Sequence, residues 1–338
     1  MSQSFNPSHL LPYLLILFLT AMGNDAFGDD YQLGLGHKVS DKMTVGGYFS
    51  LEFGKGDKTD ELVLDDLAFL AYGNLTPGFS YLFELESVEP YIYDFETDKS
   101  ETNFPPSIER LYGDFKFSDS ANLRVGKFIT PIGYWNLQPI NVLRDTSSNP
   151  RYSRETFPKF LTGIDLHGYT PFDNDLAYHF FVQATQDLDD AYINIPIDQH
   201  VGVTLNKQLT QDWHAGMSVG EYHQTDDTDV QYIQFNARWD VGRYRVSIEA
   251  IANRLDTPGF ATEQKRSAYL QLEHRISERH MLIARYEYLN DDFSNEKETI
   301  RVLGYSYRPV FPVSLKAEYQ WHSDSSDNQL LTSFSVLF

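Results

Sequence analysis

Apolar and polar side chains alternate along most of the chain, from Met43 to its end. In 313–322 (VSLKAEYQWH), every second residue is apolar or aromatic and the residues between them are polar. The same pattern recurs in 233–239 (IQFNARW) and in 244–250 (YRVSIEA). A period of two is typical of a β-strand with one apolar and one polar face. No long helical periodicity competes with it, so the chain is predicted to be all-β.

Sixteen such segments follow one another, and the connections between them alternate in length. The short connections are turns such as TPG, DSA, PFDN and LTQ, and the long ones include 89–106 and 130–161. Such alternation predicts an up-and-down meander with short turns at one end and long loops at the other. The segments are 43–54, 61–73, 78–88, 107–117, 121–129, 162–170, 175–185, 198–207, 211–223, 229–239, 242–253, 265–275, 279–289, 298–308, 312–322 and 328–338.

An even number of antiparallel strands with this turn pattern predicts a transmembrane β-barrel, with short periplasmic turns and long external loops. About ten residues of tilted strand span roughly 25 Å of hydrocarbon. Only a closed barrel pairs all the backbone polar groups of its strands within lipid. A soluble secreted β-sandwich is the competing fold, but it gives no reason for the chain to end on an aromatic strand, with Phe334, Val336 and Phe338 on one face.

The first residues predict export. Leu10 to Leu19 form an apolar run that is too short for a comfortable membrane span, and Ala26-Phe27-Gly28 suits signal-peptidase cleavage. The preceding residues contain no Lys or Arg, so an N-terminal anchor remains the alternative. We expect a signal peptide at 1–28, a periplasmic N-terminal segment at 29–42 and the barrel at 43–338.

Composition restricts the function further. A net charge of −21 argues against nucleic acid as a partner, and the absence of cysteine excludes disulfides, thiolate metal sites and thiol nucleophiles. The aromatic share is 15%, high for a chain with a mean hydropathy of −0.40. Outward-facing rings at the two membrane interfaces would account for this combination.

The inward face of the predicted barrel is charged. Sixteen strands enclose a lumen too wide for side chains to fill, so water is its expected content. Charged side chains are costly in a dry core but ordinary on the wall of an aqueous channel. The predicted pore wall comprises Glu84, Glu86, Arg110, Asp114, Lys116, Arg124, Arg238, Arg245, Glu249, Arg285, Glu287, Lys316 and Glu318.

The segment 107–136 carries a strand, a turn and a strand, followed by a Gly-x-Phe-x-x-Pro-x-Gly stretch. The motif residues are Gly126, Phe128, Pro131 and Gly133. This segment resembles the bacterial outer-membrane porin superfamily, in particular the phosphate-selective porin O/P type, and 302–322 resembles it more weakly. The resemblance implies a sixteen-stranded, trimeric barrel whose third external loop folds into the lumen. The closing strand, with Phe334, Val336 and Phe338, resembles the signal read by the outer-membrane assembly machinery.

The connection 130–161 has the position and length of that third loop. Its cations Arg144, Arg151, Arg154 and Lys159 outnumber Asp145 and Glu155, which gives a net charge of 4 − 2 = +2. At a constriction these cations would favour anions. Alternatively, Arg151 and Arg154 pin the loop to lumenal carboxylates such as Glu84 and Glu86, or the loop does not fold inward. The lysine or arginine ladder of phosphate porins is absent, because lumenal cations here are interleaved with acids.

The sequence favours a porin for passive diffusion of small hydrophilic solutes or ions, with anion preference as one version. A non-conducting barrel that binds a partner is the alternative. His167 and His179 lie near Asp165 on adjacent segments, but no nucleophile motif accompanies them, so neither catalysis nor a cofactor or metal is expected. The expected partners are outer-membrane lipids, the assembly machinery and two further copies of the chain. The acidic loops are either solvated or bridged to lipopolysaccharide by divalent cations.

Overall fold

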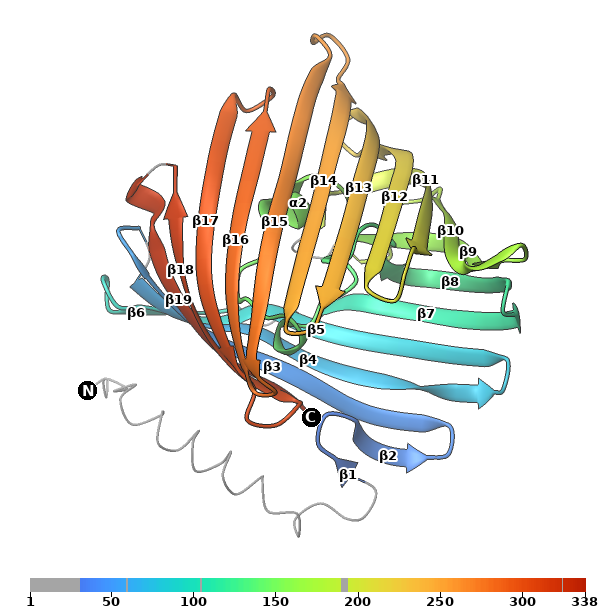
Figure 1. Cartoon of the computed structure of the whole chain (residues 1–338), viewed down its shortest axis with the longest axis horizontal. Coiled ribbons are helices and arrows are strands. Elements are labelled where there is room, and N and C mark those ends of the chain that lie inside the picture. The colour runs from blue at the N-terminus through green and yellow to red at the C-terminus, as the bar shows by residue number, and fades with distance from the viewer. Residues whose placement is uncertain (1–30, 59, 104, 190–193, 324) are drawn as a thin grey trace.

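The computed structural model describes residues 31–58, 60–103, 105–189, 194–323 and 325–338. The predicted signal peptide at 1–28 lies outside the described residues. The fold is a closed antiparallel β-barrel (Figure 1). Within the described residues, no helix has the length and apolar character needed to cross a bilayer.

Each of the sixteen predicted segments corresponds to one barrel strand. The strands are β3 (Met43–Gly56), β4 (Asp60–Thr76), β5 (Phe79–Asp94), β7 (Ser107–Ser118), β8 (Ala121–Ile129), β9 (Phe160–Thr170), β10 (Asp173–Gln183), β11 (Ile197–Gln208), β12 (Trp213–Gln224), β13 (Asp229–Val241), β14 (Tyr244–Asp256), β15 (Glu263–Ser277), β16 (His280–Asp291), β17 (Glu296–Tyr307), β18 (Val313–His322) and β19 (Gln329–Leu337).

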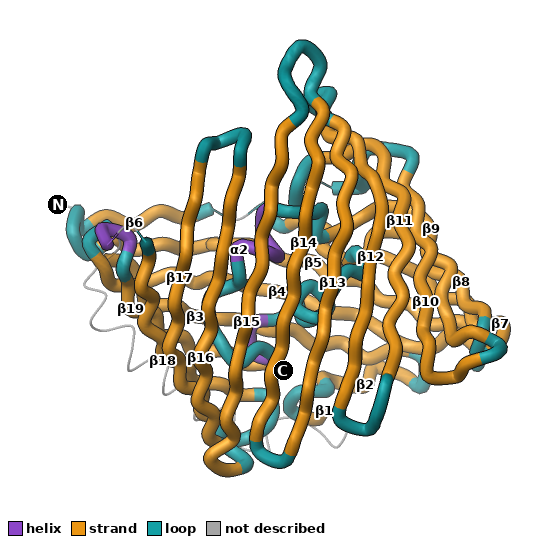
Figure 2. The backbone as a smooth tube through the Cα atoms, turned by 45° about the horizontal axis from the view of Figure 1, so that its top comes forward, coloured by secondary structure: helices purple, strands orange, loops and turns teal. Residues whose placement is uncertain are grey.

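Consecutive barrel strands pair antiparallel, and the last strand pairs with the first. In the closing pair, Leu337 faces Tyr48 and Phe334 faces Leu51. Closure leaves no unpaired strand edge, which is the condition for a sheet to cross lipid. Figure 2 shows the resulting ring of strands.

Three short strands lie outside the ring. β1 (Tyr31–Gln32) and β2 (Gly36–Ser40) form a hairpin before the barrel, in a region expected only as a periplasmic segment, and β2 pairs with the start of β3. β6 (Lys99–Thr102) forms an antiparallel hairpin with the far end of β5, beyond the residues of β5 that pair with β7. The alternating pattern of these residues is too short to identify them from sequence.

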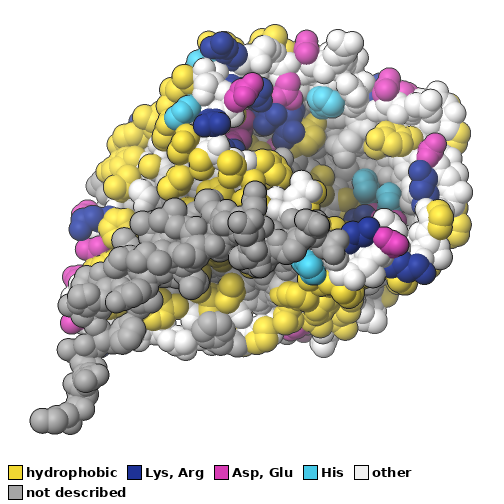
Figure 3. Space-filling model, turned by 90° about the horizontal axis from the view of Figure 1, so that it is seen from below, with side chains coloured by type: hydrophobic (Ala, Val, Ile, Leu, Met, Phe, Trp, Pro, Cys, Tyr) yellow, Lys and Arg dark blue, Asp and Glu magenta, His cyan; other side chains and the backbone are white. Residues whose placement is uncertain are grey.

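The two faces of the barrel follow the alternation. On β13, Phe235 is 52% exposed and its neighbours Gln234 and Asn236 are buried, which places the phenyl ring outside and the amides inside. On β18, Leu315 and Trp321 are exposed, whereas Lys316 is buried. Figure 3 shows hydrophobic side chains gathered on the outer surface, and charged and histidine side chains around a hollow.

The two ends of the barrel differ less than the sequence suggests. The turns at one end are short, from 171–172 to the longer 308–312. At the other end, only 95–106, 130–159 and 184–196 are long, because several strands continue for a few residues beyond their predicted ends. Within 130–159 lie η2 (Asn141–Leu143) and α2 (Arg151–Glu155), and α2 lies inside the ring of strands in Figures 1 and 2.

Candidate pore constriction

The segment 130–159, here called the lumen loop, contacts inward-facing side chains around much of the barrel. Its first anchor is Glu249 on β14, which is completely buried. The carboxylate accepts hydrogen bonds from the backbone N–H groups of Tyr134 and Trp135, both at 2.9 Å, and from the hydroxyl of Tyr269. Bonds from backbone N–H groups to a carboxylate are charge-assisted and stronger than neutral ones.

A second anchor lies on β18, four strands further around the barrel from β14. Glu318 accepts hydrogen bonds from the backbone N–H groups of Ser147 and Ser148 at 3.0 and 3.2 Å. Lys316 lies two residues before Glu318 on the same face of β18. It donates to the backbone carbonyl of Asn141 at 2.6 Å and to that of Thr146 at 3.2 Å. Two neighbouring wall charges of opposite sign therefore hold the N–H and C=O groups of the same loop.

A third anchor lies on β16. Arg285 donates to Glu287 at 2.7 Å, to the hydroxyl of Thr146 at 2.8 Å and to that of Ser148 at 2.6 Å. Glu287 also accepts from the backbone N–H of Arg151 at 2.9 Å. These wall residues face inward, but they bind the lumen loop instead of lining open water.

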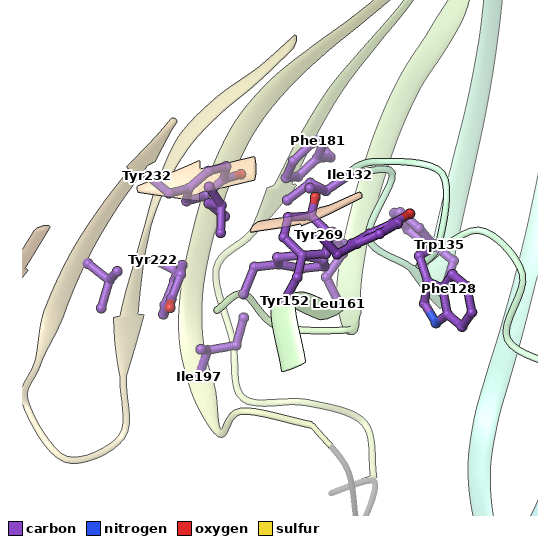
Figure 4. Close-up of a cluster of buried hydrophobic side chains, with 13 residues drawn as sticks. Phe128, Ile132, Trp135, Tyr152, Leu161, Phe181, Ile197, Tyr222, Tyr232 and Tyr269 are labelled. Atoms are coloured by element: carbon purple, nitrogen blue, oxygen red, sulfur yellow. The ribbon is translucent and has the colours of Figure 1, made fainter. Parts of the chain in front are cut away.

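Hydrophobic packing fixes the lumen loop on one side. Ile132, Trp135, Tyr152 and Phe157 of the loop pack against inward-facing side chains of β8 to β15. Figure 4 shows this cluster. The wall members are Phe128, Leu161, Phe181, Ile197, Tyr222, Val230, Tyr232, Ile251 and Tyr269. This side of the lumen is therefore packed with aromatic side chains, whereas the sequence predicts water throughout.

The four predicted constriction cations have different environments. Arg144 is buried and donates to the backbone carbonyl of Gln138 at 2.8 Å and also to Pro139 and Asn149, so it braces the loop internally. Arg154 is exposed and forms no ion pair within the part of the chain that the structure describes. Lys159 lies over the ring of Phe160 at 4.9 Å.

Arg151 binds three carboxylates. It pairs with Glu155 at 2.7 Å and with Glu296 and Glu298 on β17. These carboxylates differ from the examples Glu84 and Glu86, which bind Arg110 and Tyr48 respectively. Arg151 thus joins the lumen loop to the opposite part of the wall.

Two of the loop cations have shifted pKa values. Burial by itself would lower the pKa of the Arg151 guanidinium, but its hydrogen bonds with Glu155 and Glu296 raise it above the usual range. Burial lowers the pKa of Lys159, and the nearby Glu109 carboxylate opposes this shift.

A cavity of about 930 Å³ lies between the lumen loop and the strands β3 to β7 and β16 to β19. Twelve acidic side chains and five Lys or Arg side chains line it. The acidic ones are Glu52, Asp65, Asp66, Glu84, Glu86, Glu89, Glu109, Glu155, Glu287, Glu296, Glu298 and Asp327, and the basic ones are Lys58, Arg144, Arg151, Arg154 and Lys159. The loop's own excess of positive charge is therefore outweighed by the wall.

Other predicted wall residues form local pairs. Tyr48 donates to Glu84 at 2.9 Å and to Glu86 at 3.1 Å. Arg124 binds Asp114 at 2.6 Å. Arg245 binds Asp240 at 2.6 Å and Glu273 at 3.3 Å, and Arg238 lies over the ring of Tyr134 at 4.6 Å. Lys116 is exposed beside the turn and pairs with Asp119 at 2.9 Å.

The glycines of the Gly-x-Phe-x-x-Pro-x-Gly stretch allow close backbone approaches. Gly133 has a φ of +68°, and a Cβ there would lie 1.9 Å from Oε2 of Glu249. Gly126 has a φ of +129°, and a Cβ there would lie 2.1 Å from the carbonyl oxygen of Leu111. Phe128 is completely buried in the aromatic cluster, and Pro131 is buried at the start of the lumen loop.

The C-terminal aromatics lie at the barrel seam. The rings of Phe334 and Phe338 contact Phe49 of β3, with centroids 5.9 and 6.4 Å apart, and Val336 is buried between the strands. Phe338 also exchanges two backbone hydrogen bonds of 2.8 Å with Gly47. These residues therefore help to close the barrel, a role separate from the predicted recognition by the assembly machinery.

The sequence did not identify the inward-facing aromatics. Tyr222, Tyr232 and Tyr269 occupy positions that the alternation assigns to the lumenal face. The aromatic residues, however, were expected on the outward, lipid-facing side of the barrel. Glu109 was also missed, and both of its carboxylate oxygens are buried without a hydrogen-bond partner among the described residues. A signal was present, since tyrosines occupy polar-face positions on three of these strands.

Comparisons with known proteins support this architecture. The anion-selective porin from Comamonas acidovorans superposes with a TM-score of 0.62 at 11% identity, over 88% of this chain and 99% of that chain. The OmpF porin of Salmonella typhi, in complex with daunomycin, gives 0.63 at 11%, over 88% and 98%. The outer-membrane channel DcaP of Acinetobacter baumannii gives 0.57 at 12%, over 90% and 100%.

Sequence comparison contributes less. A family described as protein of unknown function, DUF481, matches residues 224–312, which is a minority of the chain. No curated protein matches. The structural likenesses are to outer-membrane porins and channels, and the chain shares their fold, a closed sixteen-stranded antiparallel β-barrel.

Proposed function

We propose that this chain is a porin of the outer membrane of a Gram-negative bacterium, a passage through which small hydrophilic solutes and ions diffuse. The observation that carries the proposal is the cavity of about 930 Å³, which lies inside a closed barrel beside an inward-folded loop and is lined largely by charged side chains. Such walls suit hydrated solutes, because charged groups keep water in contact with the passage. No catalytic role is proposed.

The charges of the cavity favour cations. Twelve acidic groups face five basic ones, and three of the five, Lys58, Arg144 and Arg151, are bound by groups of the protein. A lining of one dominant sign raises the local concentration of the opposite ion. An anion-preferring, phosphate-like channel is the alternative version of the proposal, and it depends on Arg154 and Lys159 outweighing these acids.

The test is a reversal potential across a planar bilayer under a salt gradient. We expect discrete channels with a potential of the sign that indicates cation preference. Glu109→Gln should shift the potential toward zero, and Arg154→Ala should shift it further toward cations. The matched control is Glu278→Gln, which lies on an exposed turn outside the cavity and should change nothing. An anion preference would overturn the cation version, and folded protein without channels would overturn the porin proposal.

The non-conducting barrel remains the second candidate because of one observation. The aromatic cluster and the three polar anchors fill much of the lumen with protein. A barrel that serves only as a scaffold for a partner would show no ion current in the same bilayer experiment.

We further propose a homotrimer, assembled by the outer-membrane machinery from a chain exported with residues 1–28 as signal. One structure of the similar OmpT of Vibrio cholerae is described as a trimer. The exposed acidic loops are proposed to face lipopolysaccharide. Native mass spectrometry from mild detergent measures the oligomer directly, and a purely monomeric mass would contradict this part.

A further inference from the structure

Two histidines and a buried aspartate face the lumen from β9 and β10. His167 and His179 are direct cross-strand partners, and their rings stack with centroids 5.4 Å apart. Nδ1 of His179 lies 2.9 Å from Oδ2 of Asp165, and Nδ1 of His167 lies 3.3 Å from the same oxygen. One ligand atom from each of the three residues fits within 4.8 Å of the others.

The aspartate has an unused binding capacity. Asp165 is only 1% exposed, yet its Oδ1 has no hydrogen-bond partner among the described residues. A buried carboxylate oxygen without a partner is costly unless a cation or water satisfies it. The two imidazoles at its side are 17% and 24% exposed on their side chains, so the group is open to the lumen.

We propose that Asp165, His167 and His179 form a binding site for a divalent transition-metal ion on the lumenal wall. Two imidazoles and one carboxylate are the ligand types that Zn²⁺, Ni²⁺ and Cu²⁺ take in proteins, with further positions filled by water. Mg²⁺ and Ca²⁺ prefer all-oxygen sites, so the histidines select against them.

The surroundings fit a metal site. Asp114 lies 3.7 Å from Nε2 of His167, where it can orient the imidazole as a second carboxylate behind the ligand. Arg124, a cation close to His167, is engaged by Asp114 at 2.6 Å and lies over the ring of Tyr112 at 4.4 Å. Its charge is thus partly neutralised before a metal ion approaches.

A second group of similar composition, Glu298, His322 and Asp327, is a weaker candidate. Arg151 already binds Glu298, and Lys58 binds Asp327 at 2.5 Å, so the protein's own cations hold those carboxylates. No such cation binds Asp165 within the described part of the chain, where its ion-pair partners are the two histidines.

The experiment is metal titration of the refolded full chain in detergent, by calorimetry with ZnCl₂ and by electron paramagnetic resonance with CuSO₄. We expect one ion per chain and a copper spectrum with hyperfine coupling to two imidazole nitrogens. His167→Ala and His179→Ala should each weaken Zn²⁺ binding at least ten-fold. The control is His214→Ala, which removes a histidine of β12 that forms no ion pair among the described residues.

The wild-type copper spectrum decides the matter even where a variant fails to fold. A spectrum without coupled imidazole nitrogens, or an affinity that His214→Ala lowers as much as His167→Ala does, would overturn the site. Binding in detergent requires no ion current, so this result is independent of whether the barrel conducts.

Discussion

At Gly133 the backbone of the lumen loop lies directly against Glu249 of the barrel wall. The glycine allows the backbone to take a positive φ, and its missing Cβ leaves room for the carboxylate that binds the next two N–H groups. The family-like motif therefore has a physical purpose in this chain: it brings the backbone of the loop directly onto a buried charge.

Gly133→Ala is expected to destabilise the barrel more than Gly259→Ala. Both glycines have a positive φ, which costs an L-residue about 1–2 kcal/mol. Only at 133 would the Cβ meet a side chain, and displacement of Glu249 also weakens charge-assisted bonds worth about 1.5–3 kcal/mol. Gly259 has open space around its Cβ position, so it isolates the backbone effect. Urea unfolding in lipid vesicles measures the difference.

Hydrogen exchange at Tyr134 and Trp135 gives the local readout for the same pair of variants. The amides of these residues should exchange faster in Gly133→Ala and as in wild type in Gly259→Ala. Equal free energies of unfolding in the two variants would contradict the contact described here.

For single residues, the sequence predicts which side of the strand a side chain faces, but it does not predict which groups the side chain binds. The alternation predicts that Glu249, Glu287 and Glu318 point inward, and all three are buried in the structure. It does not predict that they bind backbone N–H groups of a loop more than a hundred residues away, as in the Glu249 and Glu287 contacts, because such pairing depends on how the loop folds. Local sequence carries no information on that path.

At the scale of elements, the seam between β19 and β3 decides whether the sheet closes. Phe338 contributes two backbone hydrogen bonds with Gly47 and a ring contact with Phe49. Phe338→Ala keeps the backbone bonds and removes only the ring, whereas deletion of residue 338 removes both. The two changes therefore separate barrel closure from recognition of the terminal aromatic.

We expect Phe338→Ala to refold in detergent with nearly the wild-type yield but to assemble several-fold less well in cells. The reason is that the assembly machinery is proposed to read the ring, whereas closure depends mainly on the backbone pairing. Heat-modifiable migration on a gel measures the folded fraction in both settings. A variant that assembles in cells as well as wild type would contradict a recognition role for Phe338.

Strands were easier to predict than connections. Every one of the sixteen barrel strands has a matching segment, since alternation over about ten residues is a strong pattern. The short strands β1, β2 and β6 have too few residues to show a clear alternation of apolar and polar side chains. Several barrel strands also continue into segments that the sequence predicts as loops. Pairing with a neighbour, which the sequence of one strand does not show, prolongs those ends.

For the whole molecule, the main property is the distribution of its side chains, which is the reverse of that in a soluble protein: apolar residues lie outside and charged residues lie inside. The mean hydropathy of −0.40 averages an apolar outside with a charged inside. The closed ring could be predicted from the even count of strands and the alternating connections. Composition does not indicate the aromatic packing that fills one side of the lumen, because an inward tyrosine and an outward one count alike; only the polar-face positions of the tyrosines indicate it.

The depth of the membrane can be measured on a single strand. Leu270 lies in the middle of β15 and Ile276 lies near its short-turn end, and both are well exposed on the outward face, at 47% and 44%. An arginine on the lipid face costs about 2–4 kcal/mol at the bilayer midplane and about 0–1 kcal/mol near the interface. We therefore expect Leu270→Arg to be strongly destabilising and Ile276→Arg to be nearly neutral in vesicle unfolding experiments.

The same pair of variants distinguishes lipid from water outside the barrel. In detergent-free solution, a soluble barrel would tolerate arginine equally at both positions, because each side chain would project into water. A large cost at Leu270 with a small one at Ile276 requires a hydrocarbon layer centred near the middle of β15. Equal effects at the two depths would contradict the transmembrane placement of this strand, and with it the proposal that the lumen connects two compartments.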